Sequence, residues 1–181
     1  MSLTLLAALL LAAVLLFWVI GAHNRLVAMR NDIAAAWSKV QGALEHRGAA
    51  LEPLVAALRQ PMAAEQGALD TWAAAHEQAA KAASALSAKP VGQAQAQAWV
   101  AAEATLAAAT SRVLALLGQH AQLQQQDSVA SMAAQWADGQ ARLPFARQLF
   151  NEAASAYNEA LGVFPTRWVA RGLGLQAAGL I

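Results

Sequence analysis

Apolar residues recur every three or four positions through residues 23–58 with almost no slippage. This spacing is typical of a long amphipathic helix that buries one face against partner helices. Pro53 interrupts the stretch, but the apolar phase continues beyond it, so we expect a kink in the helix and not a break. Two rows carry the pattern: Leu26, Ile33, Val40 and Leu54 in one, and Trp37, Leu44, Leu51 and Leu58 in the other.

Three further helices are predicted by the same spacing. One covers residues 61–87, with proline at its first position, and a turn at residues 89–92 separates it from a helix at 93–117. A glutamine-rich connector follows, after which Asp127 or Ser128 is placed to cap the fourth helix. Tryptophan lies on the apolar face of each long helix, so we expect Trp37, Trp72, Trp99 and Trp136 to form core layers.

The C-terminal region continues this pattern with two interruptions. Pro144 lies inside the fourth helix without shifting its apolar phase, which predicts a kink within residues 139–144. Residues 166–181 are apolar and predict a short helix folded back on the bundle, with a turn at Gly172-Leu173-Gly174. Four long amphipathic helices with short links predict an all-α fold, an antiparallel up-and-down four-helix bundle.

An uncharged apolar segment, residues 3–22, precedes the first amphipathic helix. Twenty residues at about 1.5 Å rise span about 30 Å, the thickness of a hydrocarbon core. We therefore predict a transmembrane signal anchor at residues 1–22, in contact with the lipid bilayer through residues 3–22, and a helical bundle domain at residues 23–181. A cleaved signal peptide is the alternative, but no Lys or Arg precedes the apolar run.

The basic residues that follow the segment predict its orientation. Arg25, Arg30 and Lys39 come soon after it and no Lys or Arg comes before it. By the positive-inside rule, the C-terminal domain faces the cytoplasm.

The remaining composition argues against several classes of function. The net charge of +1 and the lack of a basic patch give no support for a nucleic-acid partner, and we expect none. The chain has no cysteine, and its four histidines share no helical face at zinc-binding spacing, so we expect no metal or cofactor. No catalytic set of side chains is visible in the sequence, and we expect no enzyme.

Two charged residues fall on the apolar rows. Arg47 occupies the row of the first helix and Glu103 that of the third. Because a half-buried charge is costly unless it is paired, we expect each to meet an opposite charge on a neighbouring helix, with the other residue as a candidate. The alternative is that both side chains extend to the rim of the bundle.

Two blocks of motif lie near the two ends of the helical region. They comprise His23-Asn24, Leu26-Val27, Arg30-Asn31, Ala36-Trp37-Ser38 and Pro53-Leu54-Val55, then Ala146-Arg147, Phe150-Asn151, Tyr157-Asn158 and Phe164-Pro165. Together these blocks resemble the LemA family. The N-terminal block has His23 where the family usually has tyrosine, and the glutamine-rich segment 119–126 also departs from the family pattern. The resemblance implies a single-pass bacterial inner-membrane protein with a long-helix bundle, no established catalysis and a role in membrane organisation.

The two motif blocks lie on the first and last long helices, which can be neighbours in an antiparallel bundle. We expect their polar residues to form a structural cluster that joins these helices near the membrane, because buried polar groups need partners. The candidate residues are Arg30, Asn31, Trp37, Ser38, Arg147, Asn151, Tyr157 and Asn158.

These observations leave three classes of function open. The first is a non-enzymatic, membrane-anchored interaction or scaffold module that binds another protein or a second copy of itself. The second is an envelope-facing sensor or ligand-binding accessory domain. The third is an enzyme with an unrecognised site, which a buried polar cluster beside a ligand-sized cavity would favour.

Overall fold

The computed structural model describes residues 3–181, and every regular element in that range is helical. This confirms the predicted all-α class. The elements are α1 (Leu3–Arg59), the 3-10 helix η1 (Ala63–Glu65), α2 (Gln66–Ala88), α3 (Gln93–Leu117), α4 (Ala121–Gln124), α5 (Asp127–Gly162) and α6 (Thr166–Gly172).

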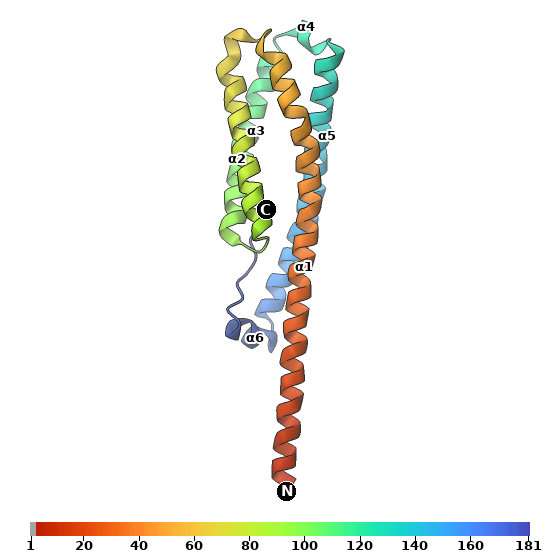
Figure 1. Ribbon diagram of the computed structural model, residues 1–181, viewed down its shortest axis with the longest axis vertical. Coiled ribbons are helices and arrows are strands. Elements are labelled where there is room, and N and C mark those ends of the chain that lie inside the picture. Colours follow the sequence, from red (N-terminus) through yellow and green to blue (C-terminus); the bar gives the residue numbers. More distant parts are fainter. Residues whose placement is uncertain (1–2) are drawn as a thin grey trace.

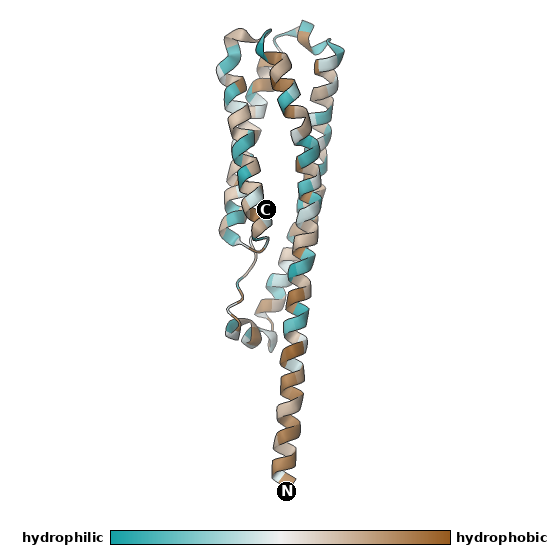
Figure 2. Cartoon of the chain, viewed as in Figure 1, coloured by the Kyte–Doolittle hydropathy of each residue, from teal (hydrophilic) through white to brown (hydrophobic). Residues whose placement is uncertain are grey.

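Helix α1 has two parts: an exposed apolar rod, residues 3–21, and a C-terminal part that forms one wall of the bundle. It continues unbroken through Pro53, and its first buried residue is Ala22 (Figure 1). The described residues before Ala22 are all exposed and form the brown end of the helix in Figure 2. Residues 1–2 of the predicted anchor lie outside the described residues. The rod suggests a membrane anchor, because a soluble protein rarely exposes so much apolar surface.

Within residues 3–181, two helices are long and apolar enough to cross a bilayer, α1 and α3. The apolar window of α1 is completely exposed, whereas that of α3 is one-third buried and belongs to the bundle. Only α1 therefore offers a rod that projects away from the domain (Figure 1).

The long helices run alternately up and down, as the sequence predicts (Figure 1). They are arranged as two pairs: α1 packs along α5 and α2 along α3, while α1 and α2 touch less extensively. Because side chains of both pairs meet along the middle of the molecule, the bundle has a core there and two long seams between the pairs.

Tryptophans organise the core into two clusters. The near core, towards the apolar rod, contains Trp37 and Trp99 with ring centroids 5.3 Å apart and nearly perpendicular planes. The far core contains Trp72 and Trp136, whose centroids are 5.2 Å apart. All four are buried, which confirms their predicted place in the core.

Helix boundaries differ from the prediction at two points. The second long helix begins at Gln66 and not at Pro61, because residues 61–65 form a turn and the 3-10 helix η1. Helix α5 begins at Asp127, so Gln126 is its N-cap and neither Asp127 nor Ser128 caps it as predicted. Both α5 and the phase of its apolar face continue through Pro144.

The tail is only partly helical, which corrects the prediction of one short helix in residues 166–181. Helix α6 ends at Gly172, a turn follows, and residues from Leu175 onward are extended. Gly174 has a φ of 64°, a left-handed conformation that glycine adopts without steric cost. The extended segment then runs back along the bundle (Figure 1).

Candidate functional site

The two charges predicted on apolar rows form a buried ion pair between α1 and α3. Arg47 Nη1 donates to Glu103 Oε2 at 2.8 Å and Nη2 donates to Oε1 at 2.7 Å. The side chains are 2% and 7% exposed, so neither reaches the rim. The structure confirms the direct pair, and its two-pronged geometry fixes the relative position of the two helices.

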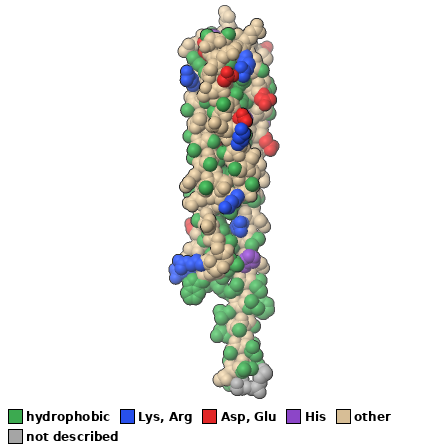
Figure 3. Space-filling view, turned by 60° about the vertical axis from the view of Figure 1, so that its left-hand side comes forward, with side chains coloured by type: hydrophobic (Ala, Val, Ile, Leu, Met, Phe, Trp, Pro, Cys, Tyr) green, Lys and Arg blue, Asp and Glu red, His purple; other side chains and the backbone are tan. Residues whose placement is uncertain are grey.

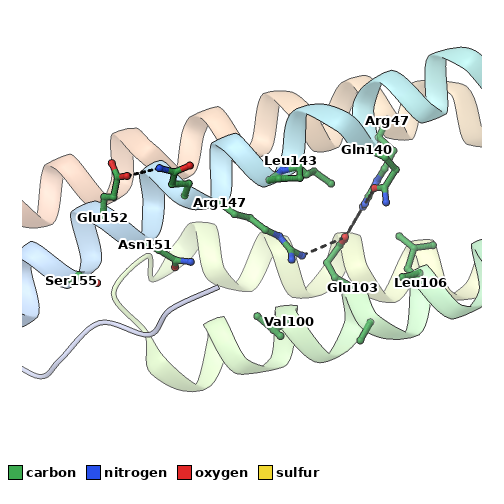
Figure 4. Close-up of a pocket in the computed structure, with 14 residues that line it drawn as sticks. Arg47, Val100, Glu103, Leu106, Gln140, Leu143, Arg147, Asn151, Glu152 and Ser155 are labelled. Atoms are coloured by element: carbon green, nitrogen blue, oxygen red, sulfur yellow. Dashed lines mark hydrogen bonds and ion pairs between the residues drawn. The ribbon is translucent and has the colours of Figure 1, made fainter.

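Helix α5 completes this charge cluster with Gln140 and Arg147. Arg47 Nη1 also donates to Gln140 Oε1 at 2.6 Å. The Arg147 guanidinium reaches across from α5, 3.9 Å from Glu103 Oε2 and 4.5 Å above the Trp99 ring (Figure 4). Burial lowers the pKa of Arg147 and the Glu103 carboxylate opposes that shift, so Arg147 stays a cation.

A glycine allows α5 to approach α1 at this level. A Cβ added to Gly139 would lie 2.7 Å from Arg47 Cα and 2.8 Å from Arg47 N. Any side chain there would push the helices apart, and Gln140 would move with the backbone. Gly139 therefore positions the cluster through backbone proximity.

The charge cluster carries one more positive than negative group. Two guanidiniums, Arg47 and Arg147, face one carboxylate, Glu103. The Nε atoms of both arginines are buried without a hydrogen-bond partner among the described residues, as is Nδ1 of His76. Burial lowers the pKa of His76, and Arg47 is the next cause, so His76 is neutral. The net charge of the cluster is therefore set by Arg47, Arg147 and Glu103.

A groove of about 790 Å³ opens beside the cluster along the seam between α3 and α5. Its walls combine apolar side chains with Arg147 and polar residues of α5 (Figure 4). A second hollow of about 400 Å³ lies between α1 and α2, and both hollows are lined by Arg47 and Glu103. The ion pair thus separates two openings. The groove is lined by Val100, Ala104, Leu106, Ala107, Leu143 and Pro144 on its apolar side and by Gln140, Arg147, Gln148, Asn151, Glu152 and Ser155 on its polar side.

The arrangement is better suited to binding than to proton transfer. Both oxygens of Glu103 accept hydrogen bonds from the Arg47 guanidinium, and a carboxylate that is paired with a cation in this way is a weak base. The described residues contain no group of three or more side chains that could hold a metal ion. Arg147, about one-third exposed, can receive an anionic group in the groove.

Among the described residues, no hydrogen bond joins the α1 members of the predicted polar cluster to its α5 members. On α1, Arg30 and Asn31 are exposed, and Ser38 donates to Ala34 O in its own helix. The Trp37 indole donates to Ser87 of α2 at 2.7 Å. The helices are neighbours as expected, but Arg30, Asn31 and Ser38 are exposed. The Trp37 ring packs in the near core against Trp99 of α3 and Phe150 of α5.

The α5 members have other partners. Arg147 belongs to the charge cluster, and Tyr157 is buried in the near core, where burial raises its pKa and Arg30 opposes the shift. Arg30 and Tyr157 line one hollow of about 650 Å³, so the structure does bring these two together. The two asparagines hold the extended tail, which sequence reasoning missed.

Asn151 and Asn158 bind the backbone of the tail, and each side-chain amide forms two hydrogen bonds with one tail residue. Asn158 accepts from Ala178 N at 2.7 Å and donates to Ala178 O at 3.0 Å. Asn151 does the same with Ile181, at 2.8 Å and 2.6 Å. Seven helical residues rise about 10.5 Å and three extended residues span about 10 Å, so the two spacings match. The seven-residue interval between asparagines was the available signal.

The comparisons with known proteins agree with the architecture. The chain matches the LemA family over residues 36–180, which covers α1 from Ala36 onward, the other three long helices, α6 and nearly all of the tail. No curated protein matches it. A match over most of the chain settles membership: this chain belongs to the LemA family.

Proposed function

We propose that this protein is a membrane-anchored, non-enzymatic interaction module that holds its bundle beside the bilayer and binds another protein or a second copy of itself. The observation that carries the proposal is the continuity of α1 from an exposed apolar rod into the bundle wall. Such a helix places the bundle axis along the direction of the anchor. The protein serves membrane organisation in this proposal, as the family resemblance also implies.

Helix continuity favours an anchor that remains attached. A signal-peptidase cut after Ala22 would fall inside α1, in the turn where packing against the domain begins. Removing residues 1–22 would leave Leu26 and the near core at a frayed helix end. We expect the full-length chain to resist extraction from membranes by alkaline carbonate.

The bundle faces the cytoplasm in this proposal, because the basic residues lie on the C-terminal side of the anchor. A single cysteine at exposed Gln122, in a chain that otherwise has none, reports the side directly. In intact cells Gln122→Cys should resist a membrane-impermeant maleimide and react after permeabilisation. Reaction in intact cells would overturn this orientation and favour the envelope-facing alternative.

We propose that the protein is not an enzyme because its buried charged side chains are already paired with one another. The Glu103 carboxylate is paired with Arg47 and lies near Arg147, and His76 is neutral with its ring against Trp136. A buried polar cluster beside a groove could also serve an enzyme, but these groups are engaged with one another. Turnover of any substrate that depended on Glu103 would contradict the proposal.

The groove favours a second candidate function, a ligand-binding accessory domain. Its apolar wall and the Arg147 guanidinium fit an anionic amphiphile, with the anion at Arg147 and the chain along Val100 and Leu143. The excess positive charge of the cluster supplies the electrostatic complement.

A fluorescent long-chain fatty acid tests this second function. Binding by the full chain should weaken at least tenfold in Arg147→Gln, and it should be unchanged in Arg142→Gln, whose side chain is exposed on the same helix. Equal binding by wild type and both variants would mean that the probe enters micelles or the anchor region and not the groove.

A further inference from the structure

The corner between α5 and α6 exposes aromatic and aliphatic side chains. Phe164 and Trp168 are 62% and 63% exposed and meet edge to face, with ring centroids 5.5 Å apart. Val163 is exposed beside them. Two rings that pack against each other and not into the core leave a preformed apolar surface, which soluble monomers seldom present without a partner.

The position of this surface relative to the anchor identifies the partner. Helix α6 packs on both α1 and α5, and burial along α1 begins at Ala22. Figure 1 shows α6 beside α1 at the level where the apolar rod leaves the bundle. Figure 3 shows hydrophobic side chains gathered there, continuous with those of the rod. The corner therefore lies at the height of the membrane surface when residues 3–22 span the bilayer.

The charges of α6 fit the same environment. Arg167 and Arg171 are exposed on the helix that carries Trp168, while Val169 and Ala170 are its buried residues. Tryptophan is enriched at membrane interfaces, and arginines beside it attract anionic head groups. A short helix with one side buried in protein and the other apolar and basic is suited to the interfacial layer.

We propose that Val163, Phe164 and Trp168, with Arg167 and Arg171, form a second membrane contact that enters the interfacial layer of anionic bilayers beside the anchor. This inference rests on the proposed anchoring by α1. One spanning helix leaves the domain free to tilt, whereas two contacts at different points fix the axis of the bundle and the direction in which the α3–α5 groove faces.

Full-length single-cysteine variants test the contact in vesicles of phosphatidylcholine and phosphatidylglycerol. An environment-sensitive fluorophore is attached at Val163→Cys, which keeps both rings, at Gln122→Cys on the far end and at Leu11→Cys in the rod. Lipids with spin labels near the head group or deep in the chain report depth, and aqueous iodide reports exposure. We expect several-fold stronger quenching at 163 than at 122 by the shallow lipid label.

The label at Leu11→Cys distinguishes failure of the second contact from failure of the anchor. Quenching of label 11 by the deep lipid label together with iodide exposure at 163 equal to that at 122 would overturn the second contact and leave the anchor intact. No lipid quenching at 11 would overturn the anchor itself. Protection of label 163 from iodide without lipid quenching would mean that a second copy covers the corner, and would also overturn the inference.

Side-chain variants in the Val163→Cys background identify the cause. Phe164→Ser with Trp168→Ser should reduce shallow lipid quenching several-fold, while Phe145→Ser, an equally exposed phenylalanine in the middle of α5, should not. Arg167→Glu with Arg171→Glu should remove the preference for phosphatidylglycerol, whereas Arg112→Glu on exposed α3 surface should keep it. Unchanged quenching in the serine variant would contradict the role of the rings.

Discussion

The near core and the far core are built from the same four long helices, but different segments complete their packing. In the far core, Trp72 and Trp136 meet edge to face and the Trp72 indole donates to Thr110 at 2.8 Å. In the near core, Trp37 and Trp99 meet in the same way, yet the extended tail also contributes buried Ala178. The far core is thus filled mainly by helical side chains, and the near core needs a non-helical segment.

The reason for the difference lies in the space between α3 and α5. The tail lies between them: Asn151 and Asn158 of α5 hold its backbone, and a Cβ at Gly179 would collide with Ala96 and Gln93 of α3. Above the tail the same seam opens into the groove. The charge cluster lies where the two cores meet, because Arg47 on α1 and Glu103 on α3 each fall between residues of the near core and residues of the far core.

The largest effect should come from breaking the charge cluster. Glu103→Ala leaves Arg47 buried without its carboxylate, and we expect the free energy of unfolding to fall by about 3–5 kcal/mol. The matched control is Asp70→Ala, which breaks the exposed Arg59–Asp70 pair and should cost less than about 1 kcal/mol. Urea unfolding in detergent micelles measures both.

A double replacement sharpens this result. Replacing Arg47 by Met together with Glu103 by Leu should recover part of the loss, because only Arg147, which is about one-third exposed, is then left without a carboxylate. Equal costs for Glu103→Ala and Asp70→Ala would show that the buried pair stabilises the fold no more than the exposed pair does.

Gly139→Ala should have the next largest effect. Its Cβ would lie 2.7 Å from Arg47 Cα, so α1 and α5 must separate, at a cost of about 1–3 kcal/mol. Gly42→Ala on α1 meets no atom within 4 Å and should stabilise its helix by about 0.5–1 kcal/mol. Thermal unfolding of both variants gives the comparison, and a neutral Gly139→Ala would mean that the helices can shift without loss.

The far core could be predicted almost completely from the sequence. Its helices follow a constant spacing of apolar residues, and a charge on such a row, as at Arg47 and Glu103, is conspicuous because the pattern defines where it falls. Burial of the row then requires that the charge be paired. Periodicity alone therefore led to the ion pair, although it gave no sign that Gln140 or Arg147 would join it.

The near core could be predicted only in part. An extended segment leaves no period in the sequence that marks it, and the prediction of one short helix in residues 166–181 fails from Leu175 onward. Asn151 and Asn158 consequently bind the tail and not α1, where their partners are predicted. Side-chain amides that bind backbone leave no complementary residue type in the sequence. The groove was equally hidden, because it results from how two helix pairs pack and not from any one pattern.

Asn158→Ala should loosen the near core and leave the far core unchanged. It removes both hydrogen bonds to Ala178, and we expect a loss of about 1–2 kcal/mol, since water can replace the amide at a partly buried site. Amide hydrogen exchange should accelerate in residues 175–181 and not around Trp72. Asn31→Ala, at an exposed position, is the control, and equal exchange in both variants would contradict the role of the tail.

The smallest effect concerns pH and belongs to the far core. Burial, and then Arg47, lower the pKa of His76, while Glu103 and Glu52 oppose them. The unfolded chain therefore takes up a proton near its ordinary pKa of about 6.5 before the folded chain does, so stability is complete above that pH and falls as the pH decreases towards the folded pKa. His76→Gln should flatten this acid limb by less than about 1.4 kcal/mol per pH unit, whereas exposed His23→Gln should not. Urea unfolding between about pH 7.5 and 5 measures the slope. An unchanged slope in His76→Gln would mean that Glu103 and Glu52 raise the pKa of His76 as much as burial and Arg47 lower it. Protonation of His76 would then not destabilise the folded protein.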